Sequence, residues 1–326
     1  LGAGAPSYIV SNTVGRFYPD RFAMVSASLV NGCNTFSYMS QQHLPLNYEI
    51  QAQSVSGTML SNYGATYGTL PSLAYVAENA NAANGAVLSP RVIETSAKNW
   101  TAGRLLVATN AMFNRAATPD GPYPELNIGL TLTDTFDGRE LAERNMNATT
   151  TGVCAGAACT ARQLNTTPLD LRFGRLRLDN AFGSGSAELP VNFITEYWYI
   201  NRFFKNLNDN CTLILRSAIN YPSGSILTPA NLTVGLSGGS TTGIYNAMTP
   251  IEIGFSGGDA GHRFSAPGAN ATGTFNVNVN LTSYPWLRFD WNGDGAHTDI
   301  SLPTAQYSFG QYRGHDRIIY WRERFD

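Results

Sequence analysis

Alternation of apolar and polar side chains at a period of two is the feature that most constrains this chain. In its clearest instance Phe275, Val277, Val279 and Leu281 alternate with three asparagines. Successive side chains of a β-strand point to opposite faces, so this pattern predicts a strand with one buried and one polar face. Strand patterns recur at residues 46–52, 126–133, 169–178, 191–199 and 318–321. In 191–199 both faces of the predicted strand are apolar.

Helical periodicity is scarce, and 32 glycines and 16 prolines separate the short strand patterns. Within 169–178 the alternation slips by one residue at Gly174, which is typical of a β-bulge. We therefore predict an all-β chain made of two antiparallel β-sandwich domains of the immunoglobulin-like type, with long loops. The predicted domains are residues 1–150 and 169–326. Residues 151–168, low in complexity, are predicted to be a loop or linker.

The charge composition limits the partners. Charged residues make up 13% of the 326 residues, and the formal net charge is −2. Nucleic-acid binding needs clustered Lys and Arg, so we predict no nucleic-acid partner. No run of 18 apolar residues occurs, so no membrane-spanning helix is predicted. A low charge suits a carbohydrate or a protein partner better than a polyanion.

The four cysteines form an even set that permits two disulfides in three connectivities. Cys154 and Cys159 bracket a short loop of small residues. A bridge between them would leave Cys33 and Cys211 as the second pair, although the spacing does not settle the connectivity. Disulfides would indicate an exported protein.

The pattern Gly-x-Ser-x-Gly occurs at 254–258 and again at 235–239. A nucleophile elbow requires a strand before the serine and a helix after it, and the sequence after Ser256 cannot form a helix. His262 and Asp259 are close in sequence, but closeness in sequence is not triad geometry. We interpret both matches as glycine-rich turns, and a serine hydrolase centred on Ser256 remains the least favoured alternative.

The strongest local motif is Asp-Trp-Asn-Gly-Asp-Gly at 290–295. Oxygen-bearing side chains alternate and end at a glycine, so they converge on one hard cation while the glycine permits a sharp turn. The preceding segment, 286–289, is predicted as a strand, so the site would not be an EF-hand. The alternative is a hairpin turn with solvated carboxylates. The predicted calcium ligands are Asp290, Asn292, Asp294, Ala296 through its carbonyl, and Asp299.

Residues 285–295 (Pro-Trp-Leu-Arg-Phe-Asp-Trp-Asn-Gly-Asp-Gly) and 309–323 resemble the C-terminal end of MshQ-like proteins. These belong to the mannose-sensitive haemagglutinin (MSHA) type IV pilus system, and their C-terminal region has no defined function. Further blocks similar to this family lie at 15–22, at 36–39 with Cys33 just before, and at 171–183. The resemblance implies a bacterial, exported, surface-associated protein, and it does not imply catalysis.

These observations together favour a non-enzymatic adhesion or structural module on a bacterial cell surface or pilus. It would present polar and aromatic surfaces to a host or surface ligand, either a glycan or a protein. For a glycan, stacking on exposed Tyr and Trp rings is the physical expectation. The alternative is a self-assembling subunit of an extracellular fibre or sheath, which would contact other pilus or fibre subunits through its edge strands.

The calcium hypothesis predicts that a chelator lowers the melting temperature of the chain. A ligand that binds only the folded state stabilises that state, so removing the ligand destabilises it. Asp290→Ala or Asp294→Ala is expected to abolish the difference between melting curves with and without chelator. Identical curves for the unmodified chain would exclude a stabilising calcium ion.

Overall fold

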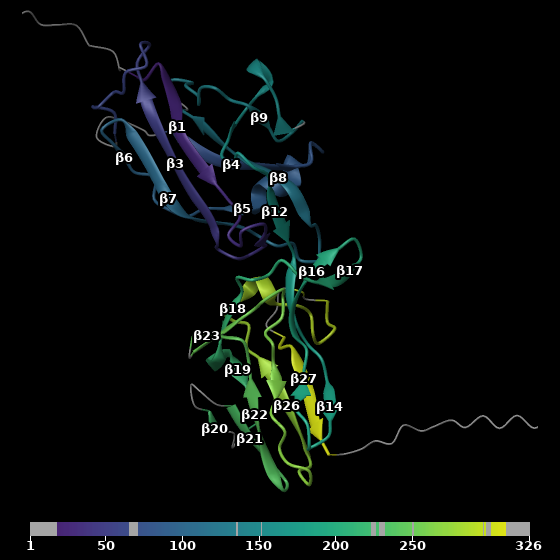
Figure 1. Ribbon diagram of the computed structural model, residues 1–326. Helices are drawn as coiled ribbons and strands as arrows, with labels where there is room; N and C mark the ends of the chain where they lie inside the picture. The colour runs from purple at the N-terminus through teal and green to yellow at the C-terminus, as the bar shows by residue number, and fades with distance from the viewer. Residues whose placement is uncertain are drawn as a thin grey trace, which may run out of the picture. The chain divides into compact units, whose positions relative to one another are not determined.

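The computed structural model describes residues 18–64, 71–134, 136–150, 152–222, 226–227, 232–249, 251–295, 297 and 301–310. Within these residues almost all regular structure is β, with only short helical turns (Figure 1). The sheets are mainly antiparallel, with parallel pairs at β12–β2 and β14–β27. The predicted all-β fold with β-sandwich domains is confirmed. The predicted strand at 318–321 lies outside the described residues.

The chain folds into two compact units that are not contiguous in sequence. Unit 1 comprises Leu1–Leu29, Pro45–Ala111 and Asn127–Thr167. Unit 2 comprises Val30–Leu44, Met112–Leu126 and Pro168–Asp326. These units differ from the contiguous halves that composition suggested, because two segments from the first half of the sequence take part in the second unit.

Two sheets supply most of unit 1, and the strands β1, β3 and β7 of the first sheet lie side by side (Figure 1). The first sheet runs β1 (Arg21–Leu29), β3 (Leu44–Gln53), β7 (Arg104–Phe113) and β5 (Val92–Ile93), with β6 (Trp100–Thr101) on β7. The second runs β11 (Arg162–Gln163), β8 (Tyr123–Thr133), β12 (Leu169–Arg172) and β2 (Ser37–Tyr38), with β4 (Ser72–Asn79) on β8. The unit boundary falls within β3, β7 and β8, and β12 and β2 belong to unit 2. The remaining elements are β9 (Met146–Asn147), β10 (Gly152–Val153), α1 (Gly85–Leu88) and the 3-10 turns Ser89–Arg91 and Gly156–Ala158.

Much of the segment predicted as a linker, 151–168, is part of unit 1. Strand β11 pairs antiparallel with β8, and β10 pairs with β9. Ala161 and Leu164, on either side of β11, are buried. The disulfide between Cys154 and Cys159 closes the loop between β10 and β11. The described part of this segment therefore consists of loop residues with two short paired strands.

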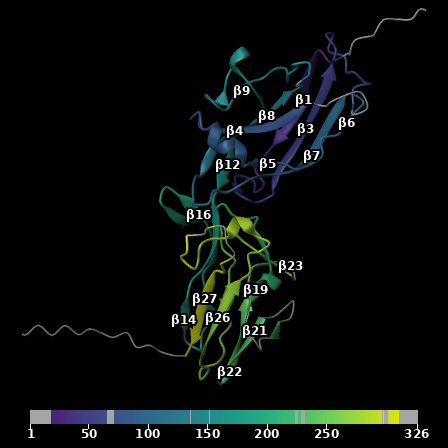
Figure 2. The same ribbon diagram turned by 180° about the vertical axis from the view of Figure 1, so that it is seen from behind.

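Unit 2 contains four further sheets. The first is β13 (Gly174–Leu178), β16 (Phe193–Tyr199) and β17 (Arg202–Lys205). The second is β14 (Ala181–Gly183), β27 (Thr304–Phe309), β26 (Gly273–Val279) and β19 (Ile219–Asn220), of which β14, β27 and β26 lie side by side in Figures 1 and 2. The third is β15 (Leu189–Pro190), β25 (Arg263–Phe264), β22 (Gly239–Ile244), β21 (Leu232–Leu236) and β20 (Ile226–Leu227). The fourth is β18 (Leu213–Leu215), β24 (Glu252–Gly254) and β23 (Ala247–Thr249), and the 3-10 turns are Arg216–Ala218 and Pro285–Leu287.

Strand β26 carries the alternation from which the fold was predicted. Phe275, Val277 and Val279 are buried, while the intervening asparagines are exposed or half-buried. On the neighbouring strand β27, Tyr307 lies opposite Phe275 and Ala305 opposite Val277. These cross-strand apolar pairs form part of the core of unit 2.

The predicted bulge at Gly174 is instead a change of sheet. Strand β12 pairs with β2 and β8, whereas β13, beginning at Gly174, pairs with β16. A Cβ atom at Gly174 would lie 2.5 Å from a ring carbon of Tyr38 and 2.9 Å from the carbonyl oxygen of Trp286. The alternation slips there because the chain leaves one sheet and enters another at a point too crowded for a side chain.

The core of unit 2 includes residues from the first half of the chain. Phe36 and Tyr38 are fully buried in it, and Cys33 is bonded to Cys211. Both disulfides permitted by the cysteine count are therefore formed, and no described cysteine is free. The Cys33–Cys211 bond closes a loop of 178 residues. In the chain-entropy model, a loop of that length stabilises the folded state by up to about 5 kcal/mol.

One histidine lies deep in the core of unit 2. His262 is 2% exposed, and its ring stacks on that of Tyr245 at 4.0 Å between centroids. Rings of Phe193, Phe264 and Tyr307 surround it, and neither ring nitrogen is hydrogen-bonded within the described residues. Burial disfavours the charged imidazolium and lowers the pKa of His262 to about 3. His262 is therefore a neutral core residue.

Acid is expected to destabilise the fold through His262. The unfolded side chain has a pKa of about 6.5, so between that value and the folded pKa only the unfolded state takes up the proton. The stability due to the neutral ring is complete above pH 6.5 and declines as the pH falls towards 3. At pH 5 the expected loss relative to pH 7 is about 2 kcal/mol. Urea denaturation at both pH values measures this loss.

His262→Phe should remove the loss of unfolding free energy between pH 7 and pH 5 that is due to His262, since the replacement ring takes up no proton. His43→Phe, at an exposed histidine, is the matched control and should retain it. An unchanged pH dependence in the His262→Phe variant would show that the buried histidine does not cause the acid sensitivity.

Candidate binding surface on the β16–β17 hairpin

Strands β16 and β17 form a hairpin with a two-residue turn. Tyr199 pairs with Arg202 across the turn, and Tyr197 pairs with Phe204. Because side chains alternate along each strand, one face of the hairpin carries these four residues. We call this set, together with the turn, the outer face. The other face carries Trp198 and its partner Phe203 and is called the inner face.

The inner face is packed against the rest of unit 2. The ring of Phe203 meets that of Trp198 at 5.2 Å and that of Phe289 at 5.0 Å, both edge-on. The guanidinium of Arg175 lies 3.8 Å from the centre of the Phe203 ring and forms an ion pair of 2.7 Å with Glu196. Aromatic packing and a partly buried cation–π contact therefore hold the hairpin in place.

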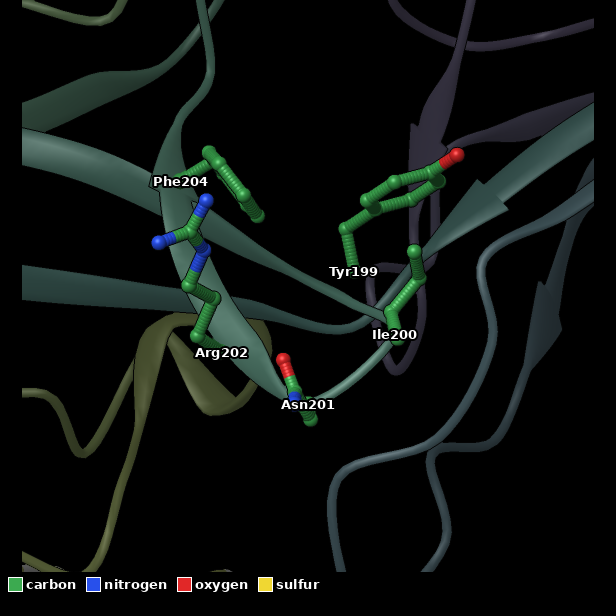
Figure 3. Close-up of a pocket in the computed structure, with 5 residues that line it drawn as sticks. All are labelled: Tyr199, Ile200, Asn201, Arg202 and Phe204. Carbon is green, nitrogen blue, oxygen red and sulfur yellow. The ribbon is translucent and has the colours of Figure 1, made fainter.

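The outer face is open. Tyr199, Ile200, Asn201, Arg202 and Phe204 line a shallow concavity there (Figure 3). Tyr199 is 44% exposed and Ile200 74% exposed. The rings of Tyr199 and Phe204 are 5.9 Å apart, and the Arg202 guanidinium lies 4.4 Å from the centre of the Phe204 ring. Rings, an amide and a cation thus meet at one exposed place.

The turn of the hairpin is strained. Ile200 has a φ of +60°, and the N–H of Asn201 donates to the carbonyl of Tyr199 at 2.8 Å. A hydrogen bond between residues two apart, around a central residue with positive φ, defines a classic γ-turn, which is rare and strained. A β-branched residue in this region is unusual and costs of order 1–3 kcal/mol. The fold keeps an exposed apolar side chain at the tip despite that cost.

A buried polar network lies at the base of β16. The Asp209 side chain is fully buried, and one of its oxygens accepts hydrogen bonds from the hydroxyls of Tyr38 at 2.9 Å, Thr195 at 2.7 Å and Thr212 at 2.7 Å. Its other oxygen accepts the N–H groups of Thr212 and Cys211. Desolvation, and then the charge of Asp209, raises the pKa of Tyr38 well above its usual value. The carboxylate is fully hydrogen-bonded, which suits a structural role.

Arg172 extends this network towards the hairpin. Its guanidinium forms a 2.7 Å ion pair with Asp170 and lies between the rings of Phe36 and Tyr197, at 4.7 Å and 4.5 Å. It also donates to Asn206, directly after β17. Tyr197, the outer-face residue farthest from the turn, is thereby held by the core of unit 2.

Three of the predicted calcium ligands are described, and Ala296 and Asp299 lie outside the described residues. Asp290 accepts hydrogen bonds from the N–H groups of Gly293, Asp294 and Gly295 at 2.7 to 3.0 Å, and the Asn292 amide donates to Asp294 at 2.7 Å. Desolvation raises the pKa of the Asp290 carboxyl, but these backbone donors together outweigh it and lower the pKa below its usual value. Much of the acceptor capacity of Asp290 is thus used within the loop. Three side chains are fewer than the six to eight oxygens calcium prefers, so the site stays a prediction.

The segment before this loop differs from its prediction. Residues Pro285–Leu287 form a 3-10 turn rather than a strand, because Pro285 has its φ preset for a helical start and Leu287 donates to the carbonyl of Tyr284. Phe289 and Trp291, which flank Asp290, pack on each other at 5.3 Å, and Phe289 also touches Phe203. The loop therefore lies next to the inner face of the hairpin.

Ser256 lies in a tight turn and not in a nucleophile elbow. Ser256 and Asp259 exchange backbone hydrogen bonds, and Gly257 and Gly258 between them both have positive φ. This is a type I′ hairpin turn with no helix after it, as the glycine-rich interpretation predicted.

Within the described residues, one group of His, Cys, Asp and Glu side chains is close enough to share a metal ion. It is Cys33, Asp209 and Cys211, and its two cysteines are joined in a disulfide.

The fold and this surface define an all-β protein with an exposed aromatic hairpin on a disulfide-bonded core. The chain belongs to the DUF6701 family: residues 1–161 match the third domain of that family and residues 172–324 match the fourth. No curated protein matches the sequence significantly.

Among solved structures, one similar chain is "Chimeric titin Z1Z2 functionalized with a KLER exogenous peptide from decorin". It is 7% identical, and the match covers 90% of this chain and 97% of that one at a TM-score of 0.23. A score this low supports no argument.

Over the described residues, none of the short helices has the length or apolar character to cross a bilayer.

Sequence reasoning did not single out the hairpin. The signal was present in the aromatic run 197–204, which is interrupted only by the turn residues and Arg202. Only residues 197–199 of this run belong to the predicted strand 191–199, whose two faces are both apolar. Both faces are buried from Phe193 to Glu196, but burial decreases towards Tyr199. The pairing of β13 with β16 ends at Tyr197, so Tyr199 at the end of β16 lies beyond it. The sequence of β16 alone does not contain that information.

Ile200→Gly is expected to stabilise the chain by about 1 kcal/mol, because glycine adopts positive φ without steric cost. The free energy of unfolding from urea denaturation measures the change. Asn201→Gly is the matched control, since Asn201 does not have positive φ and gains nothing from glycine. Equal or lower stability of Ile200→Gly relative to Asn201→Gly would mean that the turn is not strained.

Proposed function

We propose that this chain is a non-enzymatic adhesion or structural module of an exported bacterial protein, and that it contacts its ligand through the outer face of the β16–β17 hairpin. The observation that carries the proposal is the exposed concavity of Tyr199, Ile200, Asn201, Arg202 and Phe204. Exposed aromatic and Arg side chains are the types enriched at binding hot spots.

The location proposed is the cell surface or a type IV pilus. Two disulfides support an oxidising compartment, since such bonds persist outside the cytosol. The resemblance of residues 285–295 and 309–323 to MshQ-like proteins supports association with an MSHA-type pilus. A host or surface glycan or protein is the proposed partner class.

Self-assembly into a fibre is the competing function. Strand β17 is an edge strand of its sheet, and its first and last residues are Arg202 and Lys205. Charged residues on an edge strand disfavour pairing with another sheet, so this edge supports presentation rather than assembly. Mass photometry of the purified chain tests the alternative. Oligomers that grow with concentration would favour a fibre subunit.

Tyr199→Ala is expected to reduce adhesion at least about fivefold, because it removes the exposed ring at the centre of the outer face. The assay counts polystyrene beads coated with the chain on mucin-coated glass and on an epithelial monolayer. Phe182→Ala is the matched control, since Phe182 is 49% exposed and lies on β14, away from the hairpin. Adhesion of Tyr199→Ala beads at the level of the unmodified chain would refute the proposed surface.

A further inference from the structure

Arg202 differs from the other arginines in the described part of unit 2. Four of them are paired with carboxylates at 2.6 to 3.2 Å: Arg172 with Asp170, Arg175 with Glu196, Arg177 with Asp179 and Arg263 with Glu188. Arg115 and Arg288 donate to backbone carbonyls, and Arg216, which is half-buried, also has an interaction partner. Arg202 is exposed, and among the described residues its side chain makes a cation–π contact with Phe204 at 4.4 Å but no ion pair or hydrogen bond. Its N–H donors are therefore available to a ligand.

The contact with Phe204 restrains the Arg202 side chain. A cation–π contact uses none of the N–H donors of a guanidinium, so these donors stay available to a ligand. Two adjacent N–H groups of the guanidinium form the fork that matches the two oxygens of a carboxylate. Figure 3 shows the Arg202 guanidinium beside Phe204, with Tyr199 on the other side of the concavity and Asn201 at the turn between them. One cationic fork and one aromatic platform thus face a common space.

We propose that the outer face binds a sugar that carries a carboxylate, an inference that rests on the proposed function of this surface. The apolar C–H face of the pyranose lies on Tyr199, the carboxylate accepts two hydrogen bonds from Arg202, and the Asn201 amide contacts a ring hydroxyl. Sialic and uronic acids share this chemistry.

The features of the surface favour a sugar over an acidic peptide or a polyanion. An extended peptide is recognised by strand addition or by successive pockets, whereas the concavity is lined by a single hairpin whose edge is charged. A polyanion needs several cations, whereas Arg202 is the one basic residue among those lining the concavity. A single carboxylate matches a single guanidinium, so binding should weaken only modestly as salt rises.

The test is isothermal titration calorimetry of the whole chain with 3′-sialyllactose, with a disaccharide ending in glucuronic acid, and with neutral lactose. At least one acidic sugar is expected to bind about tenfold or more tightly than lactose, since hydrogen bonds to charged groups are the strong ones. R202Q should reduce that affinity to the level of lactose. R202K should restore it only in part, because an ammonium lacks the fork. The control R263Q, at a half-buried arginine paired with Glu188, should bind as the unmodified chain does.

Equal affinity for acidic and neutral sugars, or full affinity in R202Q, would overturn the inference. Competition by a tetraglutamate peptide as effective as that by the acidic sugar would overturn the choice of a glycan. If neither acidic sugar binds while Tyr199→Ala beads still lose adhesion, the ligand class is wrong and the proposed surface stands. If adhesion does not depend on Tyr199, the proposed function itself fails.

Discussion

The hydrogen bond between Tyr38 and Asp209 joins residues 171 positions apart, and the architecture of unit 2 depends on it. The same carboxylate accepts the hydroxyls of Thr195 and Thr212, and the Cys33–Cys211 disulfide lies beside it. A buried carboxylate is tolerated only when its oxygens are hydrogen-bonded, so the three segments that supply donors, at Tyr38, at Thr195 and at Cys211–Thr212, must come together. This requirement brings a segment from the first half of the sequence into the second unit.

The hairpin combines a firmly held base with a strained tip. Its base is held by the Asp209 network, by Arg172 between two rings, and by Arg175 on Phe203. Its tip has Ile200 in a conformation that normally requires glycine. Strain of this kind persists where the surroundings hold it, and functional sites are where it tends to occur. A firm base also lowers the entropic cost of binding, because the contact residues are ordered beforehand.

The predicted calcium loop and the candidate binding surface are physically connected. Asp290 lies between Phe289 and Trp291, and the rings of both contact the Arg175 side chain that also covers Phe203. The loop residues, the inner face of the hairpin and β13 thus share one aromatic and cationic cluster. A bound cation or a substitution in the loop would displace the side chains of the inner face first, since packed side chains transmit small displacements.

Local sequence determined where several strands of this protein lie and which of their faces are apolar. The alternation in β26, the turn character of 256–259 and the two disulfides permitted by the four cysteines all follow from patterns within short windows or from simple counts. Tertiary structure alone decided that the chain changes sheet at Gly174, that Val30–Leu44 joins unit 2, and that β16 is buried at Phe193 but exposed at Tyr199. The physical reason is that periodicity sets the direction of a side chain, whereas its burial depends on partners supplied by distant segments.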